Sequence, residues 1–290
     1  MQLLTNIVVL TAIYALISCG YVLVYRVSRV LNLAHGELMM VGAYLLLTTA
    51  SLFGDHPLLA VAASVLLSLV VGVLVYVLLM RRMTGESVFA AVLVTIALGI
   101  LLRGAVVLIW TGRLQYPLEI LGWENPAANL GKGAAVSGAG LLTVVVTAAT
   151  YLGLYGFFRF SRMGIRMRAA GENPLLAAQR GIELHLVYAL AWGMAVFSGG
   201  AAGMLLASDS GLEATMVIVG LKAFPAALVG GMDSLLGALI GSFLVATSEV
   251  IAIHYIDPLV SDVVPFVMLT LMLIIRPWGL FGTKEDWERV

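Results

Sequence analysis

The sequence predicts an all-α polytopic membrane protein, a bundle of eight or nine transmembrane helices in which some segments are broken or re-entrant. Hydrophobic residues make up 61% of the 290 residues and charged residues only 11%. The mean hydropathy of +1.05 lies far above that of soluble domains. The apolar residues are gathered into long runs that lack the alternation of membrane-barrel strands. We therefore expect each apolar run to form a helix.

Nine apolar runs account for this bundle, because backbone groups in lipid must pair within their own segment. They fall at about 3–25, 38–53, 58–80, 88–110, 139–158, 184–208, 217–232, 235–253 and 259–275. Two of them, 38–53 and 217–232, are shorter than the roughly 20 residues that a straight crossing needs. We expect these two either to cross as broken helices or to turn back as re-entrant segments.

The charges between the runs predict which side faces the cytoplasm, where arginine and lysine accumulate. The basic positions are Arg81, Arg82, the stretch 159–181, Arg276, Lys284 and Arg289. The loops that lack arginine and lysine, at 54–57, 209–216 and 254–262, should lie outside. Parity places the mixed loop 111–138, with Lys132, outside as well, and counting back puts the N-terminus there too. No linker or internal repeat divides the chain, so residues 1–290 should form one transmembrane domain.

The stretch 159–181 is the most basic interruption of the apolar sequence, with five arginines against a single acid. Asn173 is a good N-cap and Pro174 suits a first helical turn, so a short helix is predicted from Pro174 to Arg180, with Gly181 closing it. A short helix outside the bilayer offers a surface to a soluble partner. A structured loop without a partner is the alternative.

A polar cluster, Asn32, His35 and Glu37, lies beside Gly36 between the first two apolar runs. Polar side chains so close to the membrane usually face protein or a wet cavity. The cluster is either a broken helix that lines a route for solute or an internally satisfied cap on the second helix. His35 and Glu37 point to different helix faces and no other histidine is near, so no metal site is expected.

Lys222 and Pro225 interrupt the short run 217–232 and favour a kinked or re-entrant segment. Lys222 either neutralises a solute carboxylate or extends to the nearest interface, and we expect the second. Arg103 has the same two alternatives. Glu249 is expected at a membrane interface, near the outer end of its helix.

Several motifs in order along the chain resemble permease subunits of branched-chain amino acid ABC importers. The stretch 29–44 contains R-V-L-N-L-A-H-G-E and M-M-V-G-A-Y, although Leu33 stands where the family usually has phenylalanine. Residues 95–99 resemble a T-I-G-L segment, with Ala97 in place of glycine, and 164–182 resemble the family's cytoplasmic loop. Residues 220–238 match a G-L-K-A-F motif, where Asp233 replaces a glycine, and 276–282 match R-P-x-G-L-F-G. The resemblance spans nearly the whole chain.

The resemblance implies a transport subunit of the bacterial inner membrane that alternates its access and performs no chemistry itself. Its implied partners are a second permease subunit, homologous or identical, two cytosolic ATPase subunits and a periplasmic solute-binding protein. The sequence contains no G-x-x-x-x-G-K-[ST] motif, so ATP and Mg are expected on the ATPase subunits and no cofactor on this chain. The solute is a branched-chain or related amino acid by resemblance, although members also handle urea, amides or aromatic acids.

The resemblance also implies two sets of site residues. The family's ATPase-coupling loop falls on Ala169, Ala170, Gly171, Asn173, Pro174, Ala177, Ala178 and Gly181. The family motifs that are candidates for the solute pathway contain Asn32, His35, Gly36, Glu37, Thr95, Lys222, Phe224 and Pro225.

Two other classes of protein fit the sequence less well. An ion-coupled secondary transporter usually carries acids at mid-membrane and inverted repeats, and neither is evident from the sequence. An intramembrane enzyme needs a catalytic motif, whereas the four histidines, His35, His56, His185 and His254, are scattered. Zero net charge gives no reason to expect nucleic acid as a partner.

Overall fold

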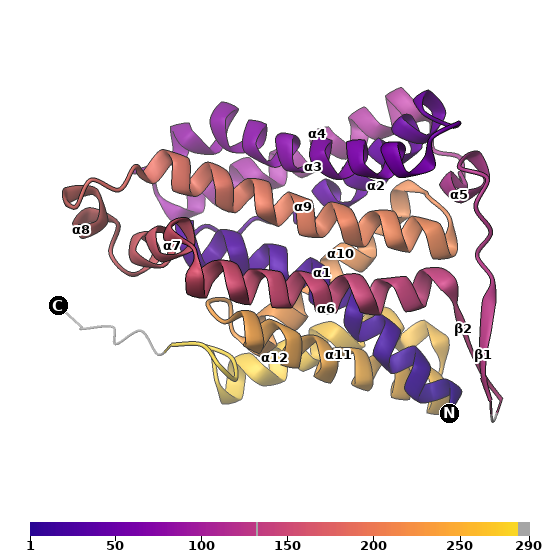
Figure 1. The fold of residues 1–290 in the computed structure, drawn as a ribbon. Helices are drawn as coiled ribbons and strands as arrows, with labels where there is room; N and C mark the ends of the chain where they lie inside the picture. Colours follow the sequence, from indigo (N-terminus) through magenta and orange to yellow (C-terminus); the bar gives the residue numbers. More distant parts are fainter. Residues whose placement is uncertain (132, 284–290) are drawn as a thin grey trace.

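Long helices lying side by side form the body of the protein in the computed structural model, which describes residues 1–131 and 133–283 (Figure 1). The main helices are α1 (Gln2–Ser28), α2 (His35–Leu52), α3 (Pro57–Leu78), α4 (Val88–Trp110), α6 (Gly138–Phe160), α9 (Leu184–Ser210), α10 (Val217–Gly230), α11 (Leu235–Tyr255) and α12 (Val264–Ile275). The predicted all-α bundle is confirmed. Lys132, Lys284 and Arg289, used above to predict orientation, lie outside the described residues.

Six of the helices in the described part of the chain, α1, α3, α4, α6, α9 and α11, are long and apolar enough to cross a membrane. The helices α2, α10 and α12 are also apolar but shorter, with 18, 14 and 12 residues. The predicted eight or nine crossings are therefore reached only when these shorter helices are counted with the six.

The centre of the bundle is built from α1 and α9, whose most apolar windows are 78% and 72% buried. Small residues let the helices approach closely there. A Cβ atom added to Gly42 on α2 would lie 2.4 Å from the Cα of Gly200 on α9, and one added to Gly203 would lie 2.3 Å from the carbonyl oxygen of Met39. Such backbone contacts are how membrane helices gain packing energy without a hydrophobic effect between them.

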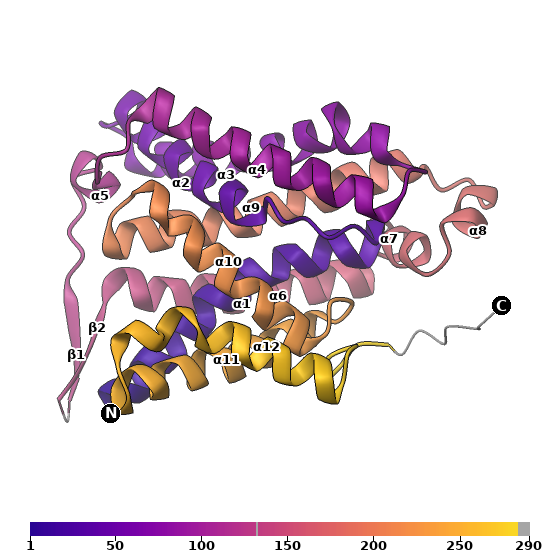
Figure 2. The same ribbon diagram turned by 180° about the vertical axis from the view of Figure 1, so that it is seen from behind.

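An extended segment, residues 29–34, interrupts the path between α1 and α2. Arg29 adopts a left-handed φ of 54° and ends α1. The chain then turns back along α4 (Figure 2), where the N–H of Leu33 donates to the Thr95 hydroxyl at 3.2 Å. The N–H of Ala34 donates to the Asn32 side chain at 3.1 Å. Because these groups are paired within the protein, α2 begins beside the middle of α4 rather than at its end.

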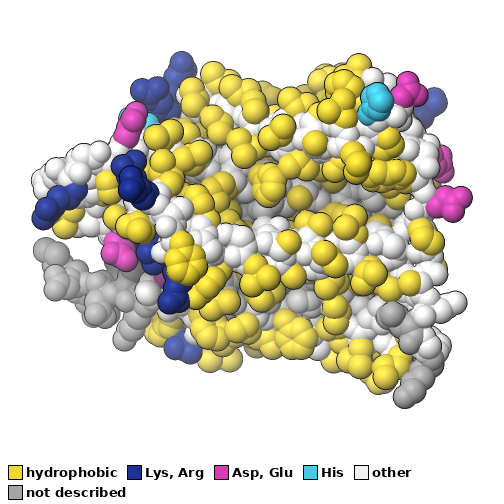
Figure 3. All heavy atoms as spheres, viewed as in Figure 1, with side chains coloured by type: hydrophobic (Ala, Val, Ile, Leu, Met, Phe, Trp, Pro, Cys, Tyr) yellow, Lys and Arg dark blue, Asp and Glu magenta, His cyan; other side chains and the backbone are white. Residues whose placement is uncertain are grey.

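The two ends of the bundle differ. At one end lie η1 (Met80–Met83), α7 (Arg162–Glu172) and α8 (Pro174–Gln179), and at the other lie α5 (Pro117–Ile120), η2 (Ala214–Met216), η3 (Pro258–Asp262) and a hairpin of β1 (Ala127–Gly131) and β2 (Ala134–Ser137). Lysine and arginine gather at the α7 and α8 end, with a hydrophobic belt between the ends (Figure 3). This distribution is that expected if the α8 end faces the cytoplasm.

Two elements differ from the sequence prediction. The hairpin, with β1 antiparallel to β2, lies in the mixed loop 111–138, for which no strand was predicted. Helix α7 replaces the first half of the expected loop at 159–181, and Ser161 caps it by accepting the N–H of Gly164 at 2.9 Å. The short helix after it is confirmed, since Asn173 caps α8 by accepting the N–H of Leu176 at 2.9 Å.

Candidate functional site

An ion pair between Glu37 and Arg103 lies in a groove between α2, α4 and α10. Arg103 Nη2 donates to Glu37 Oε1 at 3.0 Å, and the exposed fractions of the two side chains are 55% for Arg103 and 12% for Glu37. The groove encloses about 730 Å³. Apart from this pair its lining is mainly apolar, with Leu33, Ile96, Ile100, Val107, Leu108 and Leu221. The groove therefore presents one positive and one negative charge next to aliphatic side chains.

Glycines make room for this arrangement. Gly99, halfway along α4, faces the Glu37 carboxyl group, so a Cβ atom there would lie 3.1 Å from Glu37 Cδ. Gly36 packs on α10, where a Cβ atom on Gly220 would lie 2.5 Å from the Cα of Gly36. Glu37 sits in the first turn of α2. These close backbone approaches hold its carboxylate at one place between the three helices.

The other residues of the polar cluster point into the protein. His35 is fully buried, and its ring fits against α1 and α9 at Gly20 and Gly199. The ring meets Tyr21 edge-on at 4.6 Å between centroids. Neither ring nitrogen has a hydrogen-bond partner of good geometry, although the Ile17 carbonyl lies nearby. Asn32 is also buried, and its side-chain oxygen accepts the Ala34 N–H in the turn that leads into α2.

Thr95 and Phe224 support this cluster from two sides. Thr95 is buried in α4 and accepts the Leu33 N–H, which fixes the extended segment against that helix. Phe224 on α10 packs against Tyr21 at 5.3 Å between ring centroids. Pro225 lies inside α10 without ending it, because the helix runs on to Gly230. The structure thus brings Asn32, His35, Gly36, Glu37, Thr95 and Phe224 together around the start of α2.

Lys222 belongs to a second, separate charged network inside the bundle. Its ammonium donates to Glu249 Oε1 at 2.9 Å and lies 2.8 Å from Asp262 Oδ1. The hydroxyl of Tyr14 donates to the other oxygen of Glu249 at 2.5 Å. Glu249 is only 3% exposed, so our placement of it at an interface is wrong. Lys222 was expected to extend to the nearest interface, and its ammonium does reach the exposed Asp262 in η3 while it stays paired with the buried Glu249.

Asp262 is the exposed member of this network and lies in the short helix η3, between α11 and α12. Its side chain is 66% exposed. The hydrogen bond from Lys222 and the charge of its ammonium hold the pKa of Asp262 below the ordinary value. The network therefore joins α1, α10 and α11 to the connection that precedes α12.

The residues expected to couple to an ATPase divide into buried and exposed groups. Ala170, Gly171 and Ala177 are buried and Ala169 is half-buried, whereas Asn173, Pro174, Ala178 and Gly181 are exposed. A Cβ atom on Gly171 would lie 2.2 Å from the carbonyl oxygen of Arg26, near the end of α1. Gly171 thus packs α7 on α1, and only the exposed four are available to a partner.

Two leucines on α8 were missed by the sequence analysis. Leu175 and Leu176 are 69% and 56% exposed, on a helix that projects at the extreme basic end of the molecule (Figure 1). They form an exposed apolar pair at the end of the bundle where lysine and arginine gather. The signal was present in the sequence, because Leu175 and Leu176 follow directly on the predicted cap and first-turn proline.

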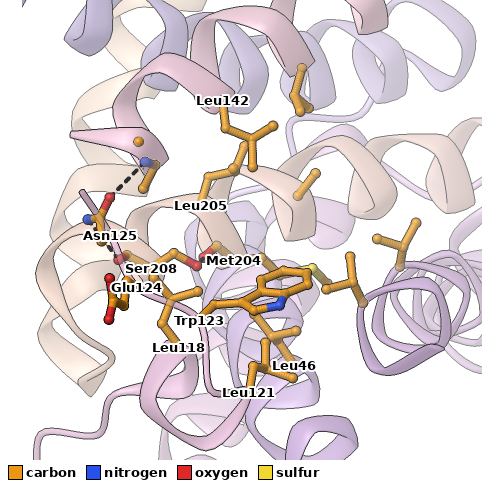
Figure 4. A pocket seen from close by; sticks show the side chains of 16 residues that line it. Leu46, Leu118, Leu121, Trp123, Glu124, Asn125, Leu142, Met204, Leu205 and Ser208 are labelled. Carbon is orange, nitrogen blue, oxygen red and sulfur yellow. Dashed lines mark hydrogen bonds between the residues drawn. The ribbon is translucent and has the colours of Figure 1, made fainter. Parts of the chain in front are cut away.

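A second pocket, of about 390 Å³, lies at the end of the bundle near α5 and is lined by residues of α2, α3, α6 and α9. Its polar residues, Glu124, Asn125 and Ser208, gather on one side, while the Trp123 ring lies with Leu118, Leu121 and Leu46 (Figure 4). Asn125 is already engaged, since its side-chain oxygen accepts the N–H of Ala139 at 2.9 Å. This lining offers no cation to a solute carboxylate.

Comparison with known proteins identifies the relatives of this chain. A family profile described as branched-chain amino acid transport system / permease component matches residues 3–273. The high-affinity branched-chain amino acid transport system permease protein LivH of Salmonella typhimurium is 30% identical over 98% of this chain and 96% of its own length. BraD of Pseudomonas aeruginosa, of the same description, is 29% identical over the same shares. PsaBC from Streptococcus pneumoniae in complex with Fab aligns over 96% of this chain and 93% of its own, with a TM-score of 0.48 and 14% identity.

Proposed function

The chain belongs to the family of permease components of branched-chain amino acid transport systems, and from this premise we infer that it carries branched-chain or related amino acids across the bacterial inner membrane. This inference rests on the similarity to the family profile and to LivH along almost the whole chain. The family is one of ABC importer permeases. The alternative of an ion-coupled secondary transporter is not supported by any of these relatives.

The importer needs partners, since permeases of this kind work with an ATPase and a solute-binding protein. We propose a complex of this chain with a second permease subunit, homologous or identical, two cytosolic ATPase subunits and one periplasmic binding protein. ATP and Mg bind to the ATPase subunits in this proposal, and this chain, residues 1–290 as one domain, binds no cofactor. The solute passes between the two permease subunits as their access alternates.

The proposed docking site for the ATPase is α8 with its flanking residues, within the coupling loop 159–181. Support comes from its position at the basic end and from the exposed Leu175 and Leu176, which suit an apolar groove on the partner. Ala178 is small and exposed on the same short helix. An ATPase that closes on ATP therefore pushes on α8.

The displacement of α8 is transmitted to the membrane helices through α7. Gly171 places α7 in backbone contact with Arg26 at the inner end of α1, and the extended segment 29–34 leads directly from there to Glu37 on α2. A displacement of α7 moves the end of α1, and with it the segment held by Thr95. This continuous path of packed backbone is the proposed mechanical link between ATP hydrolysis and the solute pathway.

The test is uptake of radiolabelled L-leucine by vesicles that contain the assembled importer. Ala178→Arg is expected to abolish uptake while ATP hydrolysis continues without stimulation by solute, because the added side chain blocks docking but is exposed in the isolated chain. Glu86→Arg, which adds an arginine to an exposed site in another loop at the same end, serves as the control and should transport normally. Full uptake by Ala178→Arg refutes the docking site, and no leucine uptake by the unaltered importer refutes the solute class.

A further inference from the structure

The Glu37–Arg103 ion pair occupies a place where lipid cannot surround it. Glu37 faces Gly99 at the middle of α4, and Arg103 follows one turn later on the same helix with 55% of its side chain exposed. A charged side chain at the centre of a bilayer costs several kcal/mol unless it meets protein or water. The groove beside this pair is therefore a wet cavity or a contact with another protein chain, not a lipid-facing surface.

We propose that this groove is the solute-binding site of the permease, in which Glu37 binds the ammonium group and Arg103 the carboxylate of an aliphatic α-amino acid. The proposal rests on the transport function proposed above and names the residues that recognise its solute. Ile96, Ile100, Val107 and Leu221 supply the wall for the aliphatic side chain. A guanidinium binds a carboxylate through two parallel hydrogen bonds, which orients the solute as well as holding it.

The internal ion pair explains how an empty site avoids unpaired charge. Without solute, Glu37 and Arg103 neutralise each other at 3.0 Å. A zwitterion enters by exchanging both partners, so each charge is paired before and after binding, and no proton moves. Arg103 is the member that swings, because it is far more exposed than Glu37. Gly99 and Gly36 keep the Glu37 carboxylate in place during the exchange.

The other candidate positions in the described chain are less suited to a zwitterion. Lys222 is 8% exposed and already engages two carboxylates, Glu249 and Asp262. The pocket near α5 is lined mostly by apolar side chains and offers no cation. His35 is sealed in the core with no pocket beside it among those described. A pocket lined by Arg29 and Glu86 also has both signs of charge, but it lies beside η1 at the end of the bundle. The groove between α2, α4 and α10 presents both signs of charge next to an open aliphatic wall within the bundle.

Cysteine labelling in membranes that contain the assembled importer tests this directly. Cys19, the one native cysteine of this chain, is fully buried, so label found on this chain after it is separated from the other subunits reports the introduced thiol. Ile100→Cys places it in the groove. Leu152→Cys on α6, at a matched exposure of 72% against 71% for Ile100, is the control outside the groove. A polar maleimide is expected to label Ile100→Cys but not Leu152→Cys, and L-leucine should slow the labelling in the groove.

Analogues that lack one charge separate zwitterion recognition from simple occupancy. 4-Methylpentanoate, which is leucine without the ammonium, and isoamylamine, which is leucine without the carboxylate, should fail to protect Ile100→Cys at concentrations where L-leucine protects. Adding Glu37→Gln or Arg103→Gln should weaken protection by L-leucine by about ten- to a hundredfold, the loss expected for one charged hydrogen bond. If these variants do not assemble, the analogue series on Ile100→Cys alone still decides.

The outcomes distinguish this site from the transport function itself. Labelling of Ile100→Cys no faster than Leu152→Cys, protection by either analogue, or unchanged protection in Glu37→Gln overturns the site. L-leucine uptake without any protection overturns the site and leaves the transport function standing. An importer that takes up no L-leucine in the same vesicles overturns the proposed function.

Discussion

Neutralising Glu249 by the change Glu249→Gln is expected to destabilise the bundle more than any change at an exposed charge. Glu249 is 3% exposed and its carboxylate accepts hydrogen bonds from Lys222 at 2.9 Å and Tyr14 at 2.5 Å. Glutamine keeps the shape but removes the charge, so the Lys222 ammonium remains inside the bundle with Asp262 as its single carboxylate. Asp262 is 66% exposed and its attraction is weakened by water.

The magnitude follows from this difference in burial. Removing one member of a buried ion pair typically costs 3–5 kcal/mol, and the remaining contact to Asp262 offsets part of that, so about 2–3 kcal/mol is expected. Asp262→Asn removes an exposed carboxylate and should cost less than about 1 kcal/mol. Replacing all three buried polar groups by apolar ones, as Tyr14→Phe, Lys222→Met and Glu249→Leu together, should recover most of the stability.

The assay is equilibrium unfolding of the purified chain in mixed micelles with increasing SDS, monitored by tryptophan fluorescence. Glu249→Gln should unfold at clearly lower SDS fractions than Asp262→Asn, and the triple variant should return close to the parent. The reasoning is refuted if Glu249→Gln and Asp262→Asn unfold together, or if the triple variant is less stable than Glu249→Gln alone. Either result means that the buried pair does not hold these helices together as the geometry implies.

Three further outcomes are expected. Gly42→Ala should destabilise by about 1–3 kcal/mol, because its Cβ would lie 2.4 Å from the Cα of Gly200, whereas Gly153→Ala, with open space around it, should be neutral in the same SDS titration. Asn173→Ala removes the α8 cap at a local cost of about 1 kcal/mol, so amide hydrogen exchange should quicken in α8 but not in α7. The lowered pKa of Asp262 means that its contact with Lys222 contributes fully above the ordinary aspartate pKa of about 3.9 and is lost as the pH falls through the lower folded value. The difference in unfolding midpoint between the parent and Asp262→Asn should therefore stay constant from pH 7 to 5 and shrink only in stronger acid.

Most of the fold could be predicted because membrane helices are long, continuous apolar runs. The run at 139–158, for example, corresponds to α6 at Gly138–Phe160, and Asn173 and Pro174 correctly marked the start of α8. Helix α7 was missed because its sequence is not apolar. The spacing of its buried residues, Gly164, Met167 and Gly171, was a helical signal hidden among arginines.

The charged networks could not be predicted because their partners are distant in the sequence. Glu37 and Arg103 are separated by 66 residues and Lys222 and Glu249 by 27. Hydropathy places each of these residues along its own helix, but not around the helix axis relative to its neighbours. Glu249 therefore looked like an interfacial acid, although α10 and α11 bring Lys222 directly to it.

The extended segment before α2 also imposes an order on biogenesis. The N–H of Leu33 finds its acceptor on Thr95, 62 residues further along the chain, so this donor is without that acceptor while the ribosome is still making the intervening helices. The hydrogen bond that fixes this segment can form only after α4 has been synthesised, so the local structure before α2 is completed later than the helices on either side of it.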